Sequence, residues 1–182
     1  MKKIWAIINN MNQSIFFIPF LFLLLTSCVD TESAPMTKVN EGPRAVFSLP
    51  NLKGEYENTD NYKGSYILIN FWATWCAPCV KEIPSLNNLY NKFKDKKKFK
   101  LIAINIGQSK EVVKKFLLDK SLPIEFTILL DEKMDLSDWN VQAIPTTFLV
   151  DKKGKIIYKV EGEKEWDSIE FTSFFNSIIE QN

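Results

Sequence analysis

The chain has 182 residues, of which 46% are hydrophobic and 13% are aromatic, and its formal net charge is +1. This length fits one ordinary domain with an N-terminal extension, and the apolar content excludes global disorder. The balanced charge offers no electrostatic basis for binding nucleic acid, and the lack of histidine excludes Cys-His and Ser-His-Asp catalytic sites and histidine-ligated metals.

The N-terminus has the pattern of an export signal. Lys2 and Lys3 precede an almost wholly apolar run of 11 residues, Ile15–Leu25. A helix that crosses a bilayer needs about 20 apolar residues, so this run is too short to span but has the length of a signal-peptide core. We therefore predict a signal peptide over residues 1–27, whose removal leaves 21 basic and 22 acidic residues.

The apolar run ends at Leu25-Thr26-Ser27-Cys28, which resembles the lipobox of bacterial lipoproteins. The cysteine of that motif receives a lipid, which would hold the protein on the extracytoplasmic, or periplasmic, side of a membrane. Lipidation of Cys28 also explains the odd number of cysteines, because it leaves a single Cys-x-x-Cys pair. The alternatives are a soluble secreted protein cleaved near Ser27 and an uncleaved anchor. Residues 28–43 are polar and lack periodicity, so we predict a tether there.

From residue 44 to 182 the chain alternates short apolar runs with helical patterns. We expect strands at 45–49, 66–71, 99–106, 125–130, 147–150 and 156–160, and helices at 78–94, 110–120 and 168–180. Turns are predicted at 51–54 and at 151–154, where Gly154 can take a positive φ. The alternation predicts a three-layer α/β/α domain with a mixed central sheet and a short N-terminal strand extension.

Cys76 and Cys79 lie where the strand at 66–71 gives way to the helix at 78–94. Positions i and i+3 share one side of a helix, so the two sulfurs can form a disulfide. The unpaired N–H groups and the dipole of the helix start lower the pKa of the Cys76 thiol, whereas Cys79 is one turn inside and more shielded. The arrangement predicts a redox-active disulfide in which Cys76 is the nucleophile and Cys79 resolves the mixed disulfide, with no further cofactor.

Two other interpretations of this pair are open. Cys-x-x-Cys is half of a structural zinc site, but two more thiolate or imidazole ligands are needed and only Cys28 is left, so we predict no metal. The second alternative is a purely structural disulfide, although a bridge that closes so short a loop stabilises a fold only slightly.

The segment Phe71-Trp72-Ala73-Thr74-Trp75-Cys76-Ala77-Pro78-Cys79, continued by Val80-Lys81-Glu82-Ile83-Pro84, resembles the TlpA/ResA branch of the thioredoxin superfamily. The similarity covers roughly residues 44–180. It implies a thioredoxin-like fold and an anchored or exported thiol-disulfide oxidoreductase, and several proteins of this branch are reductants in cytochrome c maturation. The resemblance therefore predicts an exported, disulfide-containing protein as substrate and a membrane electron donor of the thiol-disulfide type.

The resemblance also carries roles onto single residues. Glu82 matches the acidic residue near the thiols, where it could exchange a proton with Cys79; the alternative is a solvent-facing helix glutamate. Ile144-Pro145 matches the segment that holds a cis-proline against the cysteines and binds the substrate backbone; the alternative is an ordinary trans turn. Trp75 is expected to flank the docking surface. Asn70 replaces the buried aspartate of thioredoxin, and since an amide accepts no proton, that role moves towards Glu82.

Three rival functions are compatible with these residues. A disulfide-forming oxidant on the same fold would differ from a reductant in its reduction potential. A thiol peroxidase related to the peroxiredoxins would use a lone peroxidatic cysteine. A docking lipoprotein with a merely structural disulfide would have no activity.

Overall fold

The computed structural model describes residues 34–96, 98–134 and 139–180, which belong to one compact unit. The predicted signal peptide, Cys28 and the first residues of the predicted tether lie outside the described residues. No helix in the described part of the chain combines the length and the apolar character that crossing a bilayer requires.

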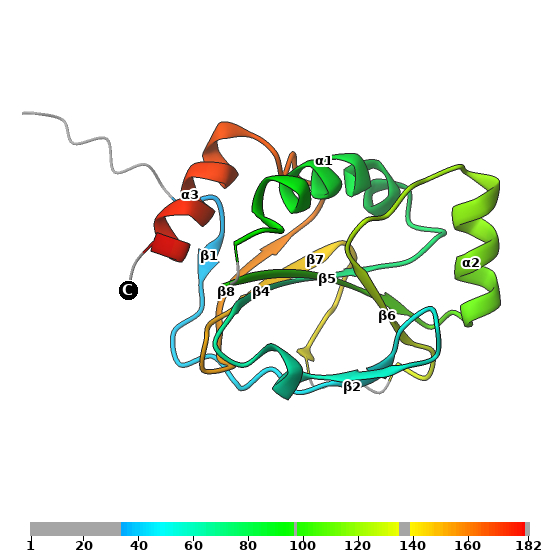
Figure 1. The fold of residues 1–182 in the computed structure, drawn as a ribbon, viewed down its shortest axis with the longest axis horizontal. Helices are drawn as coiled ribbons and strands as arrows, with labels where there is room; N and C mark the ends of the chain where they lie inside the picture. Colours follow the sequence, from blue (N-terminus) through cyan, green and yellow to red (C-terminus); the bar gives the residue numbers. More distant parts are fainter. Residues whose placement is uncertain (1–33, 97, 135–138, 181–182) are drawn as a thin grey trace, which may run out of the picture. The chain divides into compact units, whose positions relative to one another are not determined.

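The described segments build a six-stranded mixed sheet, a separate hairpin and three α-helices (Figure 1). The elements in chain order are β1 (Thr37–Lys38), β2 (Ser48–Pro50), β3 (Tyr56–Asn58), the 3-10 helix η2 (Thr59–Tyr62), β4 (Tyr66–Trp72), α1 (Ala77–Phe93), β5 (Phe99–Ile106), α2 (Lys110–Asp119), β6 (Thr127–Asp131), β7 (Thr146–Val150), β8 (Ile156–Glu161) and α3 (Ile169–Glu180).

The strand order of the large sheet is β1-β8-β7-β4-β5-β6. β4, β5 and β6 are mutually parallel, whereas β7 is antiparallel to β4, β8 to β7 and β1 to β8. The central strands β4 and β5 are covered on both faces, which explains their nearly continuous apolar sequences. Successive side chains of β4 therefore enter different cores: Leu68 and Trp72 lie in one, and Ile69 and Phe71 in the other.

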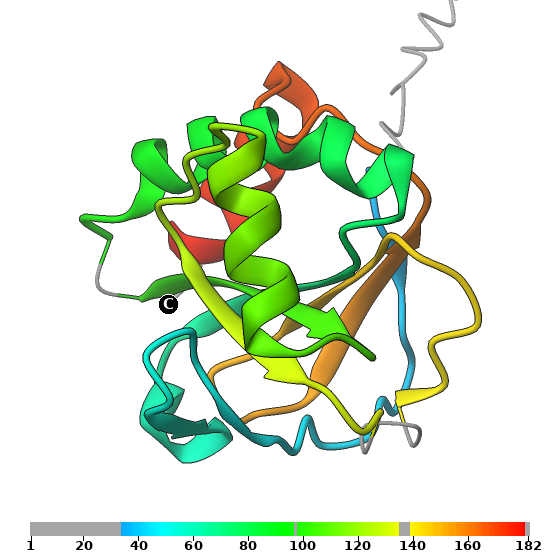
Figure 2. The same cartoon turned by 90° about the vertical axis from the view of Figure 1, so that its right-hand side faces the viewer.

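The three helices pack on the same face of this sheet. Figure 1 shows α1 and α3 along one side of the strands, and Figure 2 brings α2 to the front with α1 above it. One apolar cluster joins them to β4 and β5, with contributions such as Leu86 from α1, Val113 from α2 and Phe175 from α3. The helix that begins at the cysteines is thus held against the sheet by a common core.

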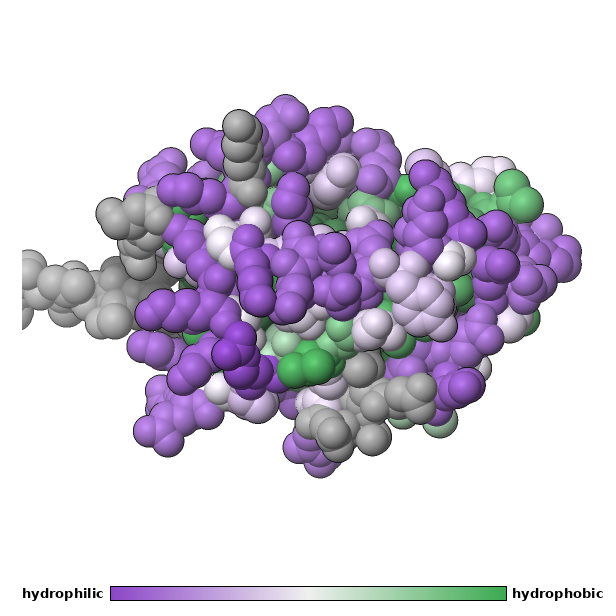
Figure 3. Space-filling model, turned by 60° about the horizontal axis from the view of Figure 1, so that its bottom comes forward, coloured by the Kyte–Doolittle hydropathy of each residue, from purple (hydrophilic) through white to green (hydrophobic). Residues whose placement is uncertain are grey.

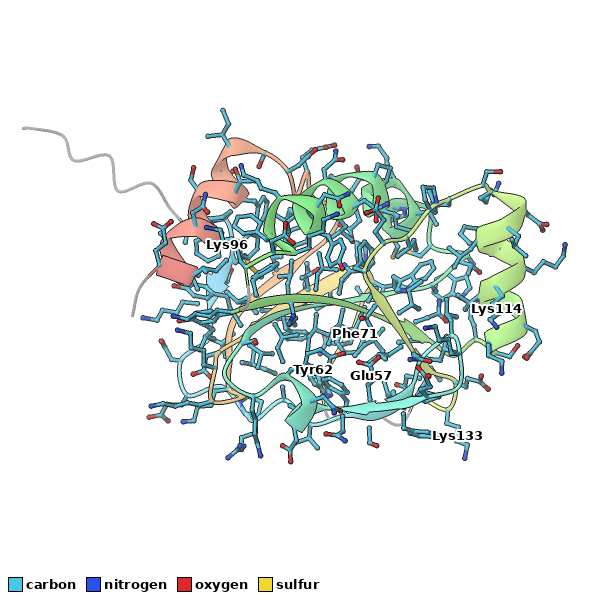
Figure 4. The ribbon with its side chains drawn as sticks, viewed as in Figure 1. Glu57, Tyr62, Phe71, Lys96, Lys114 and Lys133 are labelled. Carbon is cyan, nitrogen blue, oxygen red and sulfur yellow. A yellow bond between two sulfur atoms is a disulfide. The ribbon has the colours of Figure 1, made fainter. Side chains whose placement is uncertain are left out.

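The opposite face is covered by the β2–β3 hairpin, η2 and the N-terminal segment. Its core contains an aromatic trio in which Phe71, Trp139 and Phe148 lie with ring centroids 5.4 to 5.9 Å apart. Figure 4 shows Phe71, Tyr62 and Glu57 between the sheet and the hairpin, where the Tyr62 hydroxyl donates a hydrogen bond to Glu57. The outward side of this layer is largely hydrophilic (Figure 3).

The predicted α/β class and mixed sheet are confirmed, and each strand and helix predicted from residue 66 onwards is present. Within that class, the layer opposite α1 consists of the hairpin and η2. β3 and η2 were not predicted because three polar-patterned residues and a single turn produce no periodic signal. The predicted turn at 51–54 closes the hairpin: Gly54 N–H donates to the Asn51 carbonyl at 2.9 Å and Gly54 has φ +92°.

The boundary at residue 44 requires a correction. Met36 is buried, and β1 pairs with β8 through Thr37 and Lys38, so the sheet already begins inside the segment predicted as a tether. A two-residue strand and one buried methionine are too short for a sequence pattern, and their position is set by the edge of β8. For residues 28–33, which are not described, the tether remains a prediction.

Candidate active site

The two cysteines occupy the first turn of α1, directly after the turn that follows β4. Cys76 is the N-cap residue, Pro78 lies in the first helical turn, and the sulfurs form a disulfide with an S–S distance of 2.08 Å. The backbone N–H of Cys79 points at Cys76 Sγ across 3.3 Å. A thiolate on Cys76 would therefore sit at the positive end of the helix dipole and accept at least one backbone hydrogen bond.

Both cysteines are largely shielded, with Cys76 5% and Cys79 1% exposed. Cys79 is the less exposed of the two, as predicted, although the difference in exposed fraction is small. Trp75, by contrast, is 70% exposed, whereas Trp72 is buried in the core beneath α1 and α2. Trp75 therefore presents an exposed aromatic side chain next to the shielded sulfur of Cys76.

The segment before β7 approaches the disulfide from the other side. The Ile144–Pro145 peptide bond is cis, and the carbonyl oxygen of Ile144 lies 3.6 Å from Cys76 Sγ. Gly162 N–H donates to the carbonyl of Pro145 at 2.9 Å, which ties this segment to the end of β8. The structure thus brings together residues that are 68 positions apart in the chain, as the motif predicted.

Glu82 is buried one turn after Cys79 and is only 1% exposed, which rules out the solvent-facing alternative. Its Oε1 accepts from Asn70 Nδ2 at 2.7 Å, and its Oε2 accepts from Lys164 N at 3.2 Å and from Trp166 Nε1 at 2.9 Å. Burial raises the pKa of Glu82 to about 7, against the lowering effect of these three hydrogen bonds. The carboxyl can therefore both accept and release a proton near neutral pH.

Sequence reasoning missed most of the partners of Glu82. Asn70 also donates to Thr147 Oγ1 at 2.9 Å, so this amide links β4, α1 and β7. The backbone N–H of Trp166 donates to Ser85 Oγ at 3.1 Å, in addition to the indole bond to Glu82. The available signal was a tryptophan in the otherwise polar segment between β8 and α3, since an aromatic residue there needs a buried site.

A second hydrogen-bond group fixes the turn that precedes Cys76. Gln108, after β5, accepts from Thr74 N through Oε1 at 2.8 Å and donates from Nε2 to Thr74 Oγ1 at 2.7 Å. Asn105 Nδ2 donates to the same Oε1 at 3.1 Å. The side chain of Gln108 thereby holds the backbone that carries Trp75 and Cys76.

The site is made of two sulfurs, a buried carboxyl and backbone groups, a set suited to thiol-disulfide exchange. Cys76 stands at the helix start, with Cys79 bonded to it and the buried carboxyl of Glu82 one turn further along α1. In the described ranges, no cluster of three or more acidic or cysteine side chains is arranged to hold a metal ion. The disulfide itself carries the two electrons of the reaction.

Comparison with known proteins agrees with this chemistry. The family model described as AhpC/TSA matches residues 42–159. The thiol-disulfide oxidoreductase ResA of Bacillus thuringiensis subsp. konkukian is 33% identical over 77% of this chain and 79% of its own. The ResA of Geobacillus kaustophilus is 37% identical over 68% of this chain and 70% of its own.

Solved structures give the same result for the fold. A crystal structure from Chlorobium tepidum, described as a putative thiol:disulfide interchange protein DsbE, superposes with a TM-score of 0.68 at 29% identity and covers 78% of this chain and 99% of its own. The chain therefore belongs to the AhpC/TSA family and, with its Cys76–Cys79 pair on a thioredoxin-like fold, is a thiol-disulfide oxidoreductase of the ResA type.

Proposed function

We propose that this protein is a lipid-anchored, extracytoplasmic reductant of disulfides in exported proteins, of the kind used in cytochrome c maturation. Its electrons come from a membrane donor of the thiol-disulfide type. The observation that carries the proposal is the buried Glu82 behind the exchangeable Cys76–Cys79 disulfide.

The reaction needs no group beyond those of the chain and its substrate. The Cys76 thiolate attacks one sulfur of the substrate disulfide, and the other substrate sulfur leaves as a thiolate. The Cys79 thiol then gives its proton to Glu82 and attacks Cys76 Sγ, so that the Cys76–Cys79 bond forms and the mixed disulfide breaks. Two electrons pass to the substrate, and the second substrate thiolate takes a proton.

The charge distribution around the sulfurs favours a reductant over an oxidant. Strong oxidants of this fold stabilise the reduced thiolate, often with a nearby cation. Here the two residues between the cysteines, Ala77 and Pro78, carry no charge, and the chain has no histidine. The buried side chain one turn after Cys79 is the carboxyl of Glu82, which offers no positive charge to stabilise a thiolate there.

The reduction potential tests the direction of electron flow. We expect equilibration with glutathione to give a value of about −270 mV or lower, whereas a value near about −120 mV would identify a disulfide-forming oxidant. Cys76→Ser should abolish reduction of insulin, and Cys79→Ser should retain the first step and accumulate mixed disulfide. Activity that survives Cys76→Ser would contradict the mechanism.

The anchor and the substrate class need separate tests. In a bacterial host, the full-length chain should partition into the detergent phase and carry a lipid, and Cys28→Ala should move it to the aqueous phase. Equal partitioning of both forms would refute lipidation of Cys28. For the substrate, an oxidised apocytochrome c should be reduced faster than insulin; the reverse order would point to another exported protein.

A further inference from the structure

Trp166 is the most deeply buried member of the Glu82 hydrogen-bond group. It lies between β8 and α3, has no exposed surface, and packs against Phe171 with ring centroids 4.7 Å apart. Its backbone N–H donates to Ser85 Oγ and its indole N–H donates to Glu82 Oε2 at 2.9 Å, so two points of α1 hold it in place. The indole group therefore has a fixed direction towards the carboxyl.

The chemistry of the indole makes this contact selective for one protonation state. An indole N–H can donate but cannot accept, so it bonds the oxygen of an ionised carboxylate more strongly than either oxygen of the neutral acid. Asn70, on the other oxygen, carries both a donor and an acceptor and can serve either state by turning its amide. Trp166 is thus the side chain whose contribution depends most on the charge of Glu82.

We propose that Trp166 is a positioning residue for proton transfer: its indole N–H orients the Glu82 carboxyl and holds it in the charged form that accepts the Cys79 proton. This inference rests on the proposed role of Glu82 in the second step of the exchange. Trp166 lies in the segment between β8 and α3, far along the chain from the Cys-x-x-Cys motif.

The charged groups around Glu82 do not substitute for this contact. Glu163 lies in the same segment and raises the pKa of Glu82, while its own carboxylate is paired with Lys81 Nζ at 2.6 Å. Lys164 contributes its backbone N–H to Glu82, but its side chain donates to the carbonyl of Glu161 at 3.0 Å. The neighbouring elements β4 and β7 present the uncharged Asn70 and Thr147.

Trp166→Phe removes the donor and keeps most of the aromatic packing. Loss of one hydrogen bond to a charged group should raise the titration midpoint of Glu82 by about one pH unit. The ionised fraction of Glu82 at pH 7 would then fall from about a half to about a tenth, so the step that needs the carboxylate should slow about five-fold at pH 7 and hardly at all near pH 9.

Reduced protein mixed with excess Ellman's reagent separates the two steps. The first release of thionitrobenzoate reports attack by Cys76, and the second reports resolution by Cys79. We expect Trp166→Phe to shift the pH profile of the second release upwards and to leave that of the first unchanged. The midpoint of Glu82 itself is read from carboxyl carbon-13 signals, assigned by their loss in Glu82→Gln.

Trp139→Phe is the matched control, because Trp139 is also buried and donates its indole N–H, to the carbonyl of Val46 on the opposite face of the sheet. A tryptophan analogue with sulfur in place of the indole N–H, introduced at position 166, deletes the donor without changing the shape should the phenylalanine variant fold poorly. If the titration midpoint of Glu82 is unchanged both in Trp166→Phe and in the protein with the sulfur analogue at position 166, the proposed role of Trp166 is overturned. A raised midpoint with an unchanged second release also overturns it, and if Glu82→Gln then leaves that release unchanged too, the proposed role of Glu82 fails with it.

Discussion

Replacement of Glu82 by glutamine tests the most consequential feature of the site, a buried carboxyl whose pKa is raised to about 7. Glutamine keeps the shape of the side chain and cannot ionise. Its oxygen can accept from Trp166 and Lys164, and its amide can donate to Asn70 once the Asn70 amide turns over. The variant therefore removes the charge and keeps the shape of the side chain.

The expected pH dependence follows from the two ionisation states. Below a pH of about 4.5 the carboxyl is protonated in both the folded and the unfolded chain, so its ionisation does not affect stability. As the pH rises from 4.5 to about 7, the unfolded chain ionises while the folded chain resists, and the free energy of unfolding falls. The raised pKa lowers the free energy of unfolding by about 3 kcal/mol in total, and this decrease is complete once the pH exceeds the pKa of Glu82 in the folded chain.

Urea unfolding of the oxidised protein at several pH values between about 4 and 8 measures this difference. Over that range the free energy of unfolding of the wild-type chain should fall by about 3 kcal/mol more than that of Glu82→Gln. Glu180→Gln, which changes an exposed glutamate at the end of α3, should behave like the wild type. Parallel pH profiles for the wild type and Glu82→Gln would refute a buried, neutral-pH carboxyl.

Two further predictions concern packing and the turn before the nucleophile. A Cβ on Gly42 would overlap the carbonyl oxygen of Ile156, so Gly42→Ala should lower the free energy of unfolding by about 1–3 kcal/mol or more. Gly54→Ala, where no atom lies near the new Cβ, should lower the free energy of unfolding by about 1–2 kcal/mol through its positive φ alone. Urea unfolding of Gly42→Ala that matches the wild type would contradict the docking of residues 36–44. Gln108→Ala removes two hydrogen bonds to Thr74 and should slow the first thionitrobenzoate release but not the second; an effect confined to the second release would contradict this assignment.

The redox motif was predictable because its geometry is local. The spacing of Cys76 and Cys79 and the change from a strand pattern to a helix pattern suffice to place both sulfurs in one helical turn. The cis Ile144–Pro145 bond was implied by the resemblance of this segment to thioredoxin-like proteins, and the structure has it. The edge strand at Thr37–Lys38 was not, since its hydrogen-bond partners lie on β8, more than a hundred residues later.

The sequence by itself determined the reaction class: two cysteines three residues apart at a helix start form a disulfide that can open and close. Only the tertiary structure decided the environment of Glu82, because its burial and its donors come from β4 and from the segment before α3, 12 and 84 residues away. Spacing along a helix specifies which side chains are neighbours on that helix. Desolvation, which raises the pKa of this carboxyl, depends on distant segments that close over it.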